Sequence, residues 1–178
     1  GYDVTYDLES FEASQASRIA GLMSQEDMPR LFEGRDPDYL ARATAKAIGV
    51  LSRNRKGFVL VVEGSEVDDA GHSNDTKMVT DEVLDMDRAV AVAREFAGRN
   101  GKTLIVVTAD HETGGMSITG GDIEKKEVKG AFSFTGHSGV MVPVFAYGPG
   151  SMSFTGVQDN TALFHNFYNL LSFDKKKK

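Results

Sequence analysis

Three runs of apolar residues stand out along the chain, and each is followed by polar or turn-forming residues. They are FVLVV at 58–62, TLIVV at 103–107 and VMVPVFAYG at 140–148. Short, nearly continuous apolar runs are typical of strands that are buried on both faces, as in parallel sheets. The pattern therefore predicts three strands of a central sheet.

Helical patterns lie between these runs. Asp36 and Pro37 have the residue types of a helix start, and Leu40, Ala43, Ala47, Ile48 and Leu51 continue as an apolar stripe. Two further helices are predicted over 75–101 and 160–171. The succession of strand, helix and strand between 58 and 107 is typical of a right-handed βαβ unit.

Residues 116–135 alternate between apolar and polar positions around Gly120 and Gly121, which predicts a small β hairpin with its turn at the two glycines. We therefore expect an α/β fold with a mostly parallel central sheet flanked by helices and a hairpin insertion. At 178 residues the chain is expected to form a single domain, 1–178, with a disordered lysine tail at 175–178.

Composition narrows the possible functions. The net charge of −6 argues against non-specific binding to nucleic acids or anionic membranes. No apolar run approaches the roughly 20 residues of a membrane span. Cysteine is absent, which excludes disulfides, thiolate metal sites and cysteine nucleophiles.

Acids and histidines cluster directly after two of the predicted strands. Glu63, Asp68 and His72 follow the first run, and Asp110 and His111 follow the second. In open α/β sheets, ligands bind at the carboxyl ends of the strands. Asp68 and His72 are four residues apart, so that one helical turn would place them on the same face.

A third histidine, His137, precedes the last apolar run. Carboxylates and imidazoles without thiolates are typical ligands of a catalytic zinc site. Asp68, His72 and His137 would supply three ligands to one zinc, and Asp110 and His111 only two to a second. Glu63 is an oxygen ligand that suits magnesium.

Other polar residues have simpler interpretations. A single Asp–His pair in a loop is usually polar surface, and only the two clusters together favour a site. We assign Glu66 and Asp69 to solvent, and we expect the acidic side of the second helix to be solvated. That side comprises Asp81, Glu82, Asp85 and Asp87. His165 is predicted to be a packing or surface residue.

Three motifs, in this order and at these separations, resemble those of the alkaline phosphatases. They are VEGSEVDDAGH at 62–72, TADHETGG at 108–115 and TGHSG at 135–139. The resemblance is to the C-terminal half of that family and runs from about Gly21 to Leu171. A single motif would not be specific, but the ordered set is.

The resemblance implies that Asp68, His72 and His137 bind the first zinc, Asp110 and His111 the second, and Glu63 a magnesium ion. It also implies hydrolysis of phosphomonoesters to an alcohol and inorganic phosphate through a phosphoserine. A homodimer and a periplasmic or extracellular location are implied by the family alone. Asp69 is implied to tune the surroundings of the first zinc.

The family's nucleophilic serine, its phosphate-binding arginine and its remaining metal ligands have no counterpart here. We therefore assign no catalytic residue and expect the 178 residues alone to be inactive, with both the second zinc site and the magnesium site incomplete. Ser65, Ser73, Thr113 and Ser138 are poor candidates for a replacement nucleophile. Two alternatives stay open: a non-catalytic zinc-binding module, and another superfamily member such as a phosphoglycerate mutase or sulfatase.

Overall fold

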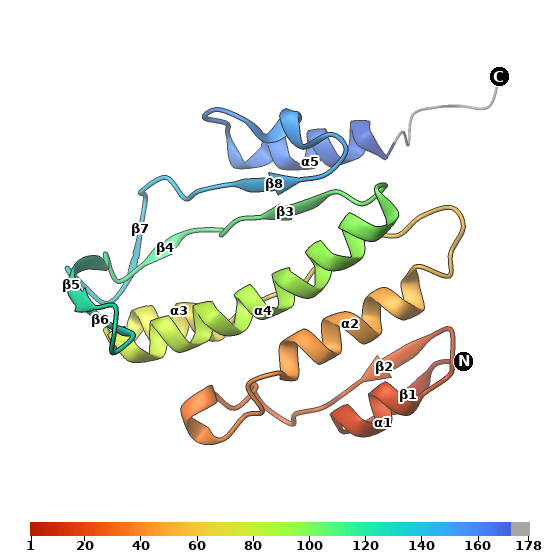
Figure 1. The fold of residues 1–178 in the computed structure, drawn as a ribbon, viewed down its shortest axis with the longest axis horizontal. Helices are drawn as coiled ribbons and strands as arrows, with labels where there is room; N and C mark the ends of the chain where they lie inside the picture. The colour runs from red at the N-terminus through yellow and green to blue at the C-terminus, as the bar shows by residue number, and fades with distance from the viewer. Residues whose placement is uncertain (172–178) are drawn as a thin grey trace. The chain divides into compact units, whose positions relative to one another are not determined.

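The computed structural model describes residues 1–171, which form two compact units (Figure 1). Unit 1 contains residues 1–93 and 113–138, and unit 2 contains 94–112 and 139–171. The predicted lysine tail at 175–178 lies outside the described residues.

Unit 1 begins with a small parallel β–α–β arrangement. Strand β1 (Asp3–Thr5) pairs in parallel with β2 (Ile19–Gly21), and α1 (Leu8–Ala13) connects them. A short 3₁₀ helix, η1 (Leu31–Glu33), precedes α2 (Tyr39–Leu51), α3 (Glu66–His72) and the long α4 (Thr76–Asn100), which continues into unit 2.

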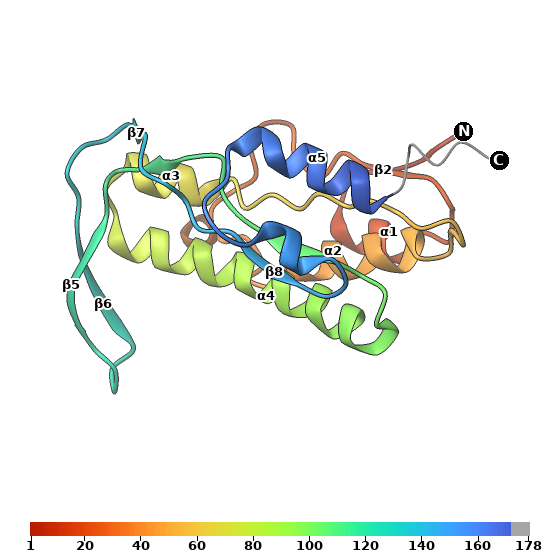
Figure 2. The same ribbon diagram turned by 90° about the horizontal axis from the view of Figure 1, so that it is seen from above.

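The rest of unit 1 is the hairpin of β5 (Ser117–Asp122) and β6 (Glu127–Ala131), followed by β7 (His137–Ser138). The hairpin lies beside the start of α4 (Figures 1 and 2), where a side chain at Gly130 would meet Thr76. Strand β7 pairs with β4 (Glu112–Thr113), at the point where the chain returns to unit 1.

Unit 2 contains the end of α4, an antiparallel strand pair, a 3₁₀ helix and the last α-helix. Strand β3 (Ile105–Val107) pairs with β8 (Phe145–Tyr147). The 3₁₀ helix η2 (Ser151–Phe154) precedes α5 (Asn160–Leu170), whose N-cap Asp159 accepts a hydrogen bond from the Thr161 amide. Among the described residues, no helix is long and apolar enough to cross a membrane.

The predicted helices are present with small shifts in their ends. Helix α2 begins at Tyr39 rather than at Pro37, because Asp36 first makes a turn in which it accepts from the amides of Asp38 and Tyr39. The hairpin is also present, but its turn was placed wrongly. Gly120 and Gly121 lie within β5, next to an irregularity in the strand register, and the turn follows Asp122.

The first apolar run differs most from expectation. Residues 58–62 are extended but join no ladder within the described part of the chain. Val59 and Val61 are 63% and 84% exposed, and Phe58, Leu60 and Val62, which alternate with them, are half-buried. The prediction that this run is buried on both faces is therefore wrong for this chain. One face of the segment packs inward and the other is open.

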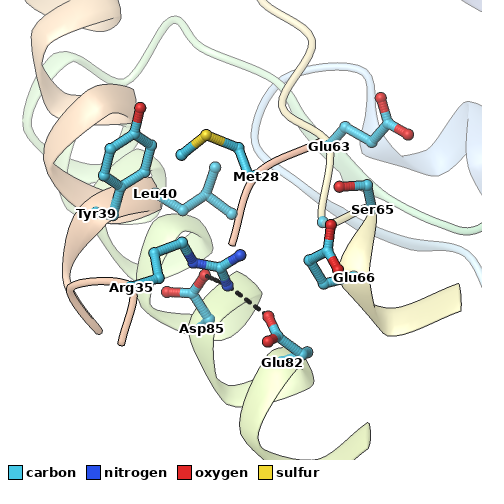
Figure 3. Close-up of a pocket in the computed structure, with 10 residues that line it drawn as sticks. Met28, Arg35, Tyr39, Leu40, Glu63, Ser65, Glu66, Glu82 and Asp85 are labelled. Carbon is cyan, nitrogen blue, oxygen red and sulfur yellow. Dashed lines mark hydrogen bonds and ion pairs between the residues drawn. The ribbon is translucent and has the colours of Figure 1, made fainter. Parts of the chain in front are cut away.

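Part of the acidic side of α4 is buried, which corrects the prediction that it is solvated. The side chains of Glu82 and Asp85 are each only 3% exposed and meet Arg35, whose side chain is 8% exposed (Figure 3). The Arg35 guanidinium contacts both carboxylates, at 2.9 Å for Asp85. Burial raises the pKa of Asp85, and Arg35 opposes that rise. Sequence spacing could not show that Arg35, some fifty residues away along the chain, covers this side of the helix.

Candidate metal centre

Helix α3 brings the first two predicted ligands together. Asp68 and His72 are one turn apart on this helix, as predicted, and Asp68 Oδ2 lies 3.3 Å from His72 Nε2. A seven-residue helix is too short to be stable by itself. Its packing is fixed instead by Ala70, which is fully buried.

Strand β7 adds the third predicted ligand. His137 Nε2 lies 3.1 Å from His72 Nε2 and 3.4 Å from Asp68 Oδ1. Ligands of a tetrahedral zinc at 2.0–2.1 Å stand about 3.3 Å apart. The separations are of that size, although they run to different oxygens of Asp68. One donor atom from each of Asp68, His72 and His137 lies within 4.8 Å of the other two, so the three residues can hold one metal ion.

The ring of His72 is oriented by a backbone carbonyl. Its Nδ1 lies 2.6 Å from Thr135 O, and because a carbonyl only accepts, Nδ1 carries the proton. The lone pair is then on Nε2, the atom that faces Asp68 and His137. The Thr135 carbonyl also raises the pKa of His72.

Thr113 holds the carboxylate of Asp68. Its hydroxyl donates to Asp68 Oδ1, which orients the group as outer-shell partners of metal ligands do. From the sequence, Thr113 is only a poor candidate for a nucleophile, and this contact is not predicted. The TADHETGG motif placed it near the site, but the contact depends on the approach of β4 to α3, which spacing along the chain does not show.

Two glycines make that approach possible. A side-chain carbon at Gly71 would lie 2.9 Å from the Thr113 carbonyl oxygen, and one at Gly114 would lie 2.7 Å from the Gly71 carbonyl oxygen. Gly114 also has φ of +86°. The backbones of α3 and of the residues after β4 thus touch where side chains would separate them.

We expect Gly114→Ala to lower the free energy of unfolding by about 1–3 kcal/mol, because the new methyl group overpacks against backbone. Urea denaturation would measure the loss. Gly34→Ala is the matched control: Gly34 has a similar φ of +100°, but nothing lies within 4 Å of an added carbon. Equal losses in the two variants would show that strained φ alone, and not the close approach, sets the cost.

The other predicted ligands lie elsewhere. Asp110 and His111 are in unit 2, where His111 Nε2 lies 3.3 Å from Asp110 Oδ2, again close to the edge length of a zinc tetrahedron. Glu63 is exposed in unit 1, just before α3, and lines a small cavity of about 60 Å³ with Tyr39 and Glu66 (Figure 3). Within the described residues, Glu63 is not part of the three-residue cluster.

Of the two neighbours on α3 that were expected to face solvent, Glu66 does not and Asp69 does so only in part. Glu66 is buried, with a side chain 7% exposed, and lies 3.3 Å from Arg30 Nε. Asp69 is half-exposed and accepts a hydrogen bond of 2.6 Å from Arg30 Nη2. Burial raises the pKa of Glu66, and the nearby Arg30 acts in the opposite direction.

Comparison with known proteins identifies the family of the chain. The family model for alkaline phosphatase matches residues 4–131. The chain belongs to the alkaline phosphatase family. Alkaline phosphatase 3 of Bacillus subtilis (strain 168) is 28% identical over 99% of this chain, and alkaline phosphatase of Escherichia coli (strain K12) is 30% identical over 93% of it. These matches cover 54% and 44% of the two relatives, so the chain spans about half their length.

The fold is that of part of an alkaline phosphatase. The solved alkaline phosphatase from the Antarctic bacterium TAB5 superposes with a TM-score of 0.83 at 34% identity, over 96% of this chain and 52% of that one. A mutant of the same enzyme was solved with Mg bound in its M3 site. The α/β fold class predicted from the sequence is thereby confirmed. The mostly parallel central sheet is not seen among the described residues, where the strands form two-stranded pairs and β3 and β8 run antiparallel.

Proposed function

We propose that this chain is the ligand-bearing portion of a metal-dependent phosphomonoesterase, with one zinc bound by Asp68, His72 and His137. The observation that carries the proposal is the closeness of the donor atoms: one from each residue lies within 4.8 Å of the other two, and the two imidazole Nε2 atoms are 3.1 Å apart. The three side chains are 39–47% exposed, which leaves room for a further ligand from solvent or substrate, as catalytic zinc sites require.

The remaining predicted ligands complete the proposal. Asp110 and His111 would supply two donors to a second zinc, and Glu63 one oxygen to magnesium; both sites need donors from other residues. The mutant of the TAB5 alkaline phosphatase that was solved with Mg bound supports a magnesium site in the family. When bound, such ions supply Lewis acidity toward a phosphoryl group.

The chain's own residues prepare that chemistry. The Thr135 carbonyl keeps the His72 proton on Nδ1, and the Thr113 hydroxyl fixes the rotation of the Asp68 carboxylate. Donors that are held in place before the metal arrives lose little freedom on binding it, which favours tight binding.

The activity, oligomeric state and location of the whole protein are likewise proposed here. We infer a phosphomonoester as substrate and alcohol and inorganic phosphate as products. We also propose that the whole protein is a homodimer and that it is located in the periplasm or outside the cell. The 178 residues by themselves are expected to bind zinc without turnover, because two of the three metal sites lack donors.

The test is a zinc titration of the purified 178-residue chain, combined with elemental analysis and p-nitrophenyl phosphate hydrolysis on the same sample. We expect about one tightly bound zinc per chain and no hydrolysis. A chain that retains no zinc would contradict the three-ligand site. Hydrolysis that a chelator abolishes would show instead that one of the chain's own hydroxyls or a metal-bound water acts as the nucleophile.

A further inference from the structure

Arg30 contacts α3, the helix that carries two of the proposed zinc ligands, through two acidic side chains, and we call these contacts the Arg30 clamp. Its Nη2 donates to Asp69 at 2.6 Å, and its Nε lies 3.3 Å from Glu66. Both acids are on α3, three residues apart, so one guanidinium holds one face of the helix. At 100° per residue, Asp68 and His72 project from a face roughly 110° further round the axis. The clamp and the proposed ligands thus share a single short helix without competing for space.

Arg30 is itself fixed at the start of η1. Its backbone amide donates to Glu33 Oε2 at 2.9 Å, and its Nη1 lies 3.6 Å from Glu33 Oε1. The guanidinium carbon also stands 6.0 Å from the centre of the Phe32 ring. Two residues after η1, Arg35 is tied to the buried acids of α4. The segment 30–35 therefore contacts α4 through Arg35 and α3 through Arg30, and so connects the two helices.

Helix α3 needs such a support. It has seven residues, no side-chain hydrogen bond at its N-cap Ser65, and a glycine, Gly71, in its last turn. Each of these features weakens an isolated helix. In the first turn of α3, Thr113 contacts Asp68, while Arg30 contacts Glu66 and Asp69; Gly114 lies against the backbone of Gly71 in the last turn.

We propose that Arg30 is a positioning residue for the zinc site: by clamping Glu66 and Asp69 it keeps α3 where Asp68 and His72 can meet His137. The inference rests on the proposed zinc site and goes beyond it, because Arg30 touches none of the three ligands in the described contacts. It also accounts for the burial of Glu66, a carboxylate that would otherwise be left unpaired inside the protein.

The direction in which zinc affinity changes when Arg30 is removed distinguishes a positioning role from a purely electrostatic one. Removing a positive charge beside a cation site should strengthen zinc binding if charge alone matters. If Arg30 positions α3, its removal should weaken binding, because zinc must then order the helix as well as bind it. A loss of about tenfold is expected, at the lower end of the range for outer-shell partners of metal ligands.

The experiment measures zinc affinity by competition with a chelating dye for the wild-type chain and for Arg30→Ala, Arg30→Lys and Arg42→Ala. Arg42 is the matched control. It is 34% exposed against 33% for Arg30, and it clamps two acids, Glu12 at 2.5 Å and Asp36 at 2.7 Å, away from α3. Thermal unfolding without zinc is recorded for each variant to show that it folds.

We expect Arg30→Ala to bind zinc about tenfold more weakly than wild type, with Arg42→Ala unchanged. Arg30→Lys keeps the charge but not the planar fork, so it should recover only part of the loss. Unchanged or tighter binding in Arg30→Ala would overturn the positioning role while leaving the zinc site intact. A wild-type chain that binds no zinc would overturn both proposals.

Discussion

Replacing Arg35 with methionine is expected to lower the free energy of unfolding by about 3–5 kcal/mol at pH 7, since two buried carboxylates would lose the cation that they share. Glu82 and Asp85 are almost fully buried, and the structure gives them Arg35 as their shared partner. Methionine has a similar length and fills the space, so the loss would report charge rather than a cavity. Urea denaturation at several pH values would measure it.

The loss should depend on pH in a definite direction. Burial already raises the pKa of Asp85 in the presence of Arg35, and without the arginine the pKa rises further. A carboxyl whose pKa is higher in the folded than in the unfolded state penalises folding above its folded pKa, and the penalty disappears as the pH falls toward its unfolded value, about 3.9. The difference between variant and wild type should therefore shrink between pH 7 and pH 4.

Arg88→Met is the control for this experiment. Arg88 also contacts Asp85, at 3.4 Å, but its side chain is 36% exposed and its second acid, Asp38, is 3.8 Å away. Solvent screening limits such a pair to about 1 kcal/mol or less. A similar loss in both variants, or a loss that does not change with pH, would mean that Arg35 contributes through packing.

His137→Ala should abolish tight zinc binding at the proposed site. Two donors on α3 would remain, and the affinity should fall by more than roughly 100-fold, because even outer-shell changes cost 10–100-fold. His137 is 47% exposed, so its loss should hardly change stability without metal. Zinc at 100 times its dissociation constant stabilises a protein by about 2.7 kcal/mol, and this stabilisation should be lost.

The measurement is thermal unfolding with and without zinc, together with the dye competition. His165→Ala is the control, because His165 is in α5 of unit 2, where its ring packs edge-on against Phe164. We expect the zinc-dependent rise in melting temperature to persist in His165→Ala and to vanish in His137→Ala. A rise of wild-type size in His137→Ala would exclude His137 as a ligand.

The sequence predicted those parts of the fold that depend on local spacing. The four-residue separation of Asp68 and His72 placed them on one helical face, and α3 has that geometry. Helices α4 and α5 follow their apolar patterns closely. The ordered motifs also predicted the family and the α/β class, which the comparisons confirm.

Contacts between distant segments could not be predicted in the same way. Glu66, Glu82 and Asp85 look like solvent-facing acids, and only the fold of residues 30–35 covers them with arginines. Spacing predicts which residues share a face but not what lies opposite that face. The run 58–62 shows the same limit, because its apolar residues indicate a strand without indicating whether a neighbouring strand is present.

The short helix α3 carries the Arg30 clamp on one face and the proposed ligands on another. Thermodynamic coupling between two such faces is reciprocal: if the clamp strengthens zinc binding by some factor, zinc strengthens the clamp by the same factor. An occupied site would then slow the local opening of residues 30–35, which Arg30 joins to α3 through Glu66 and Asp69. Amide exchange in a segment far along the chain from His137 would thus report the state of the metal centre.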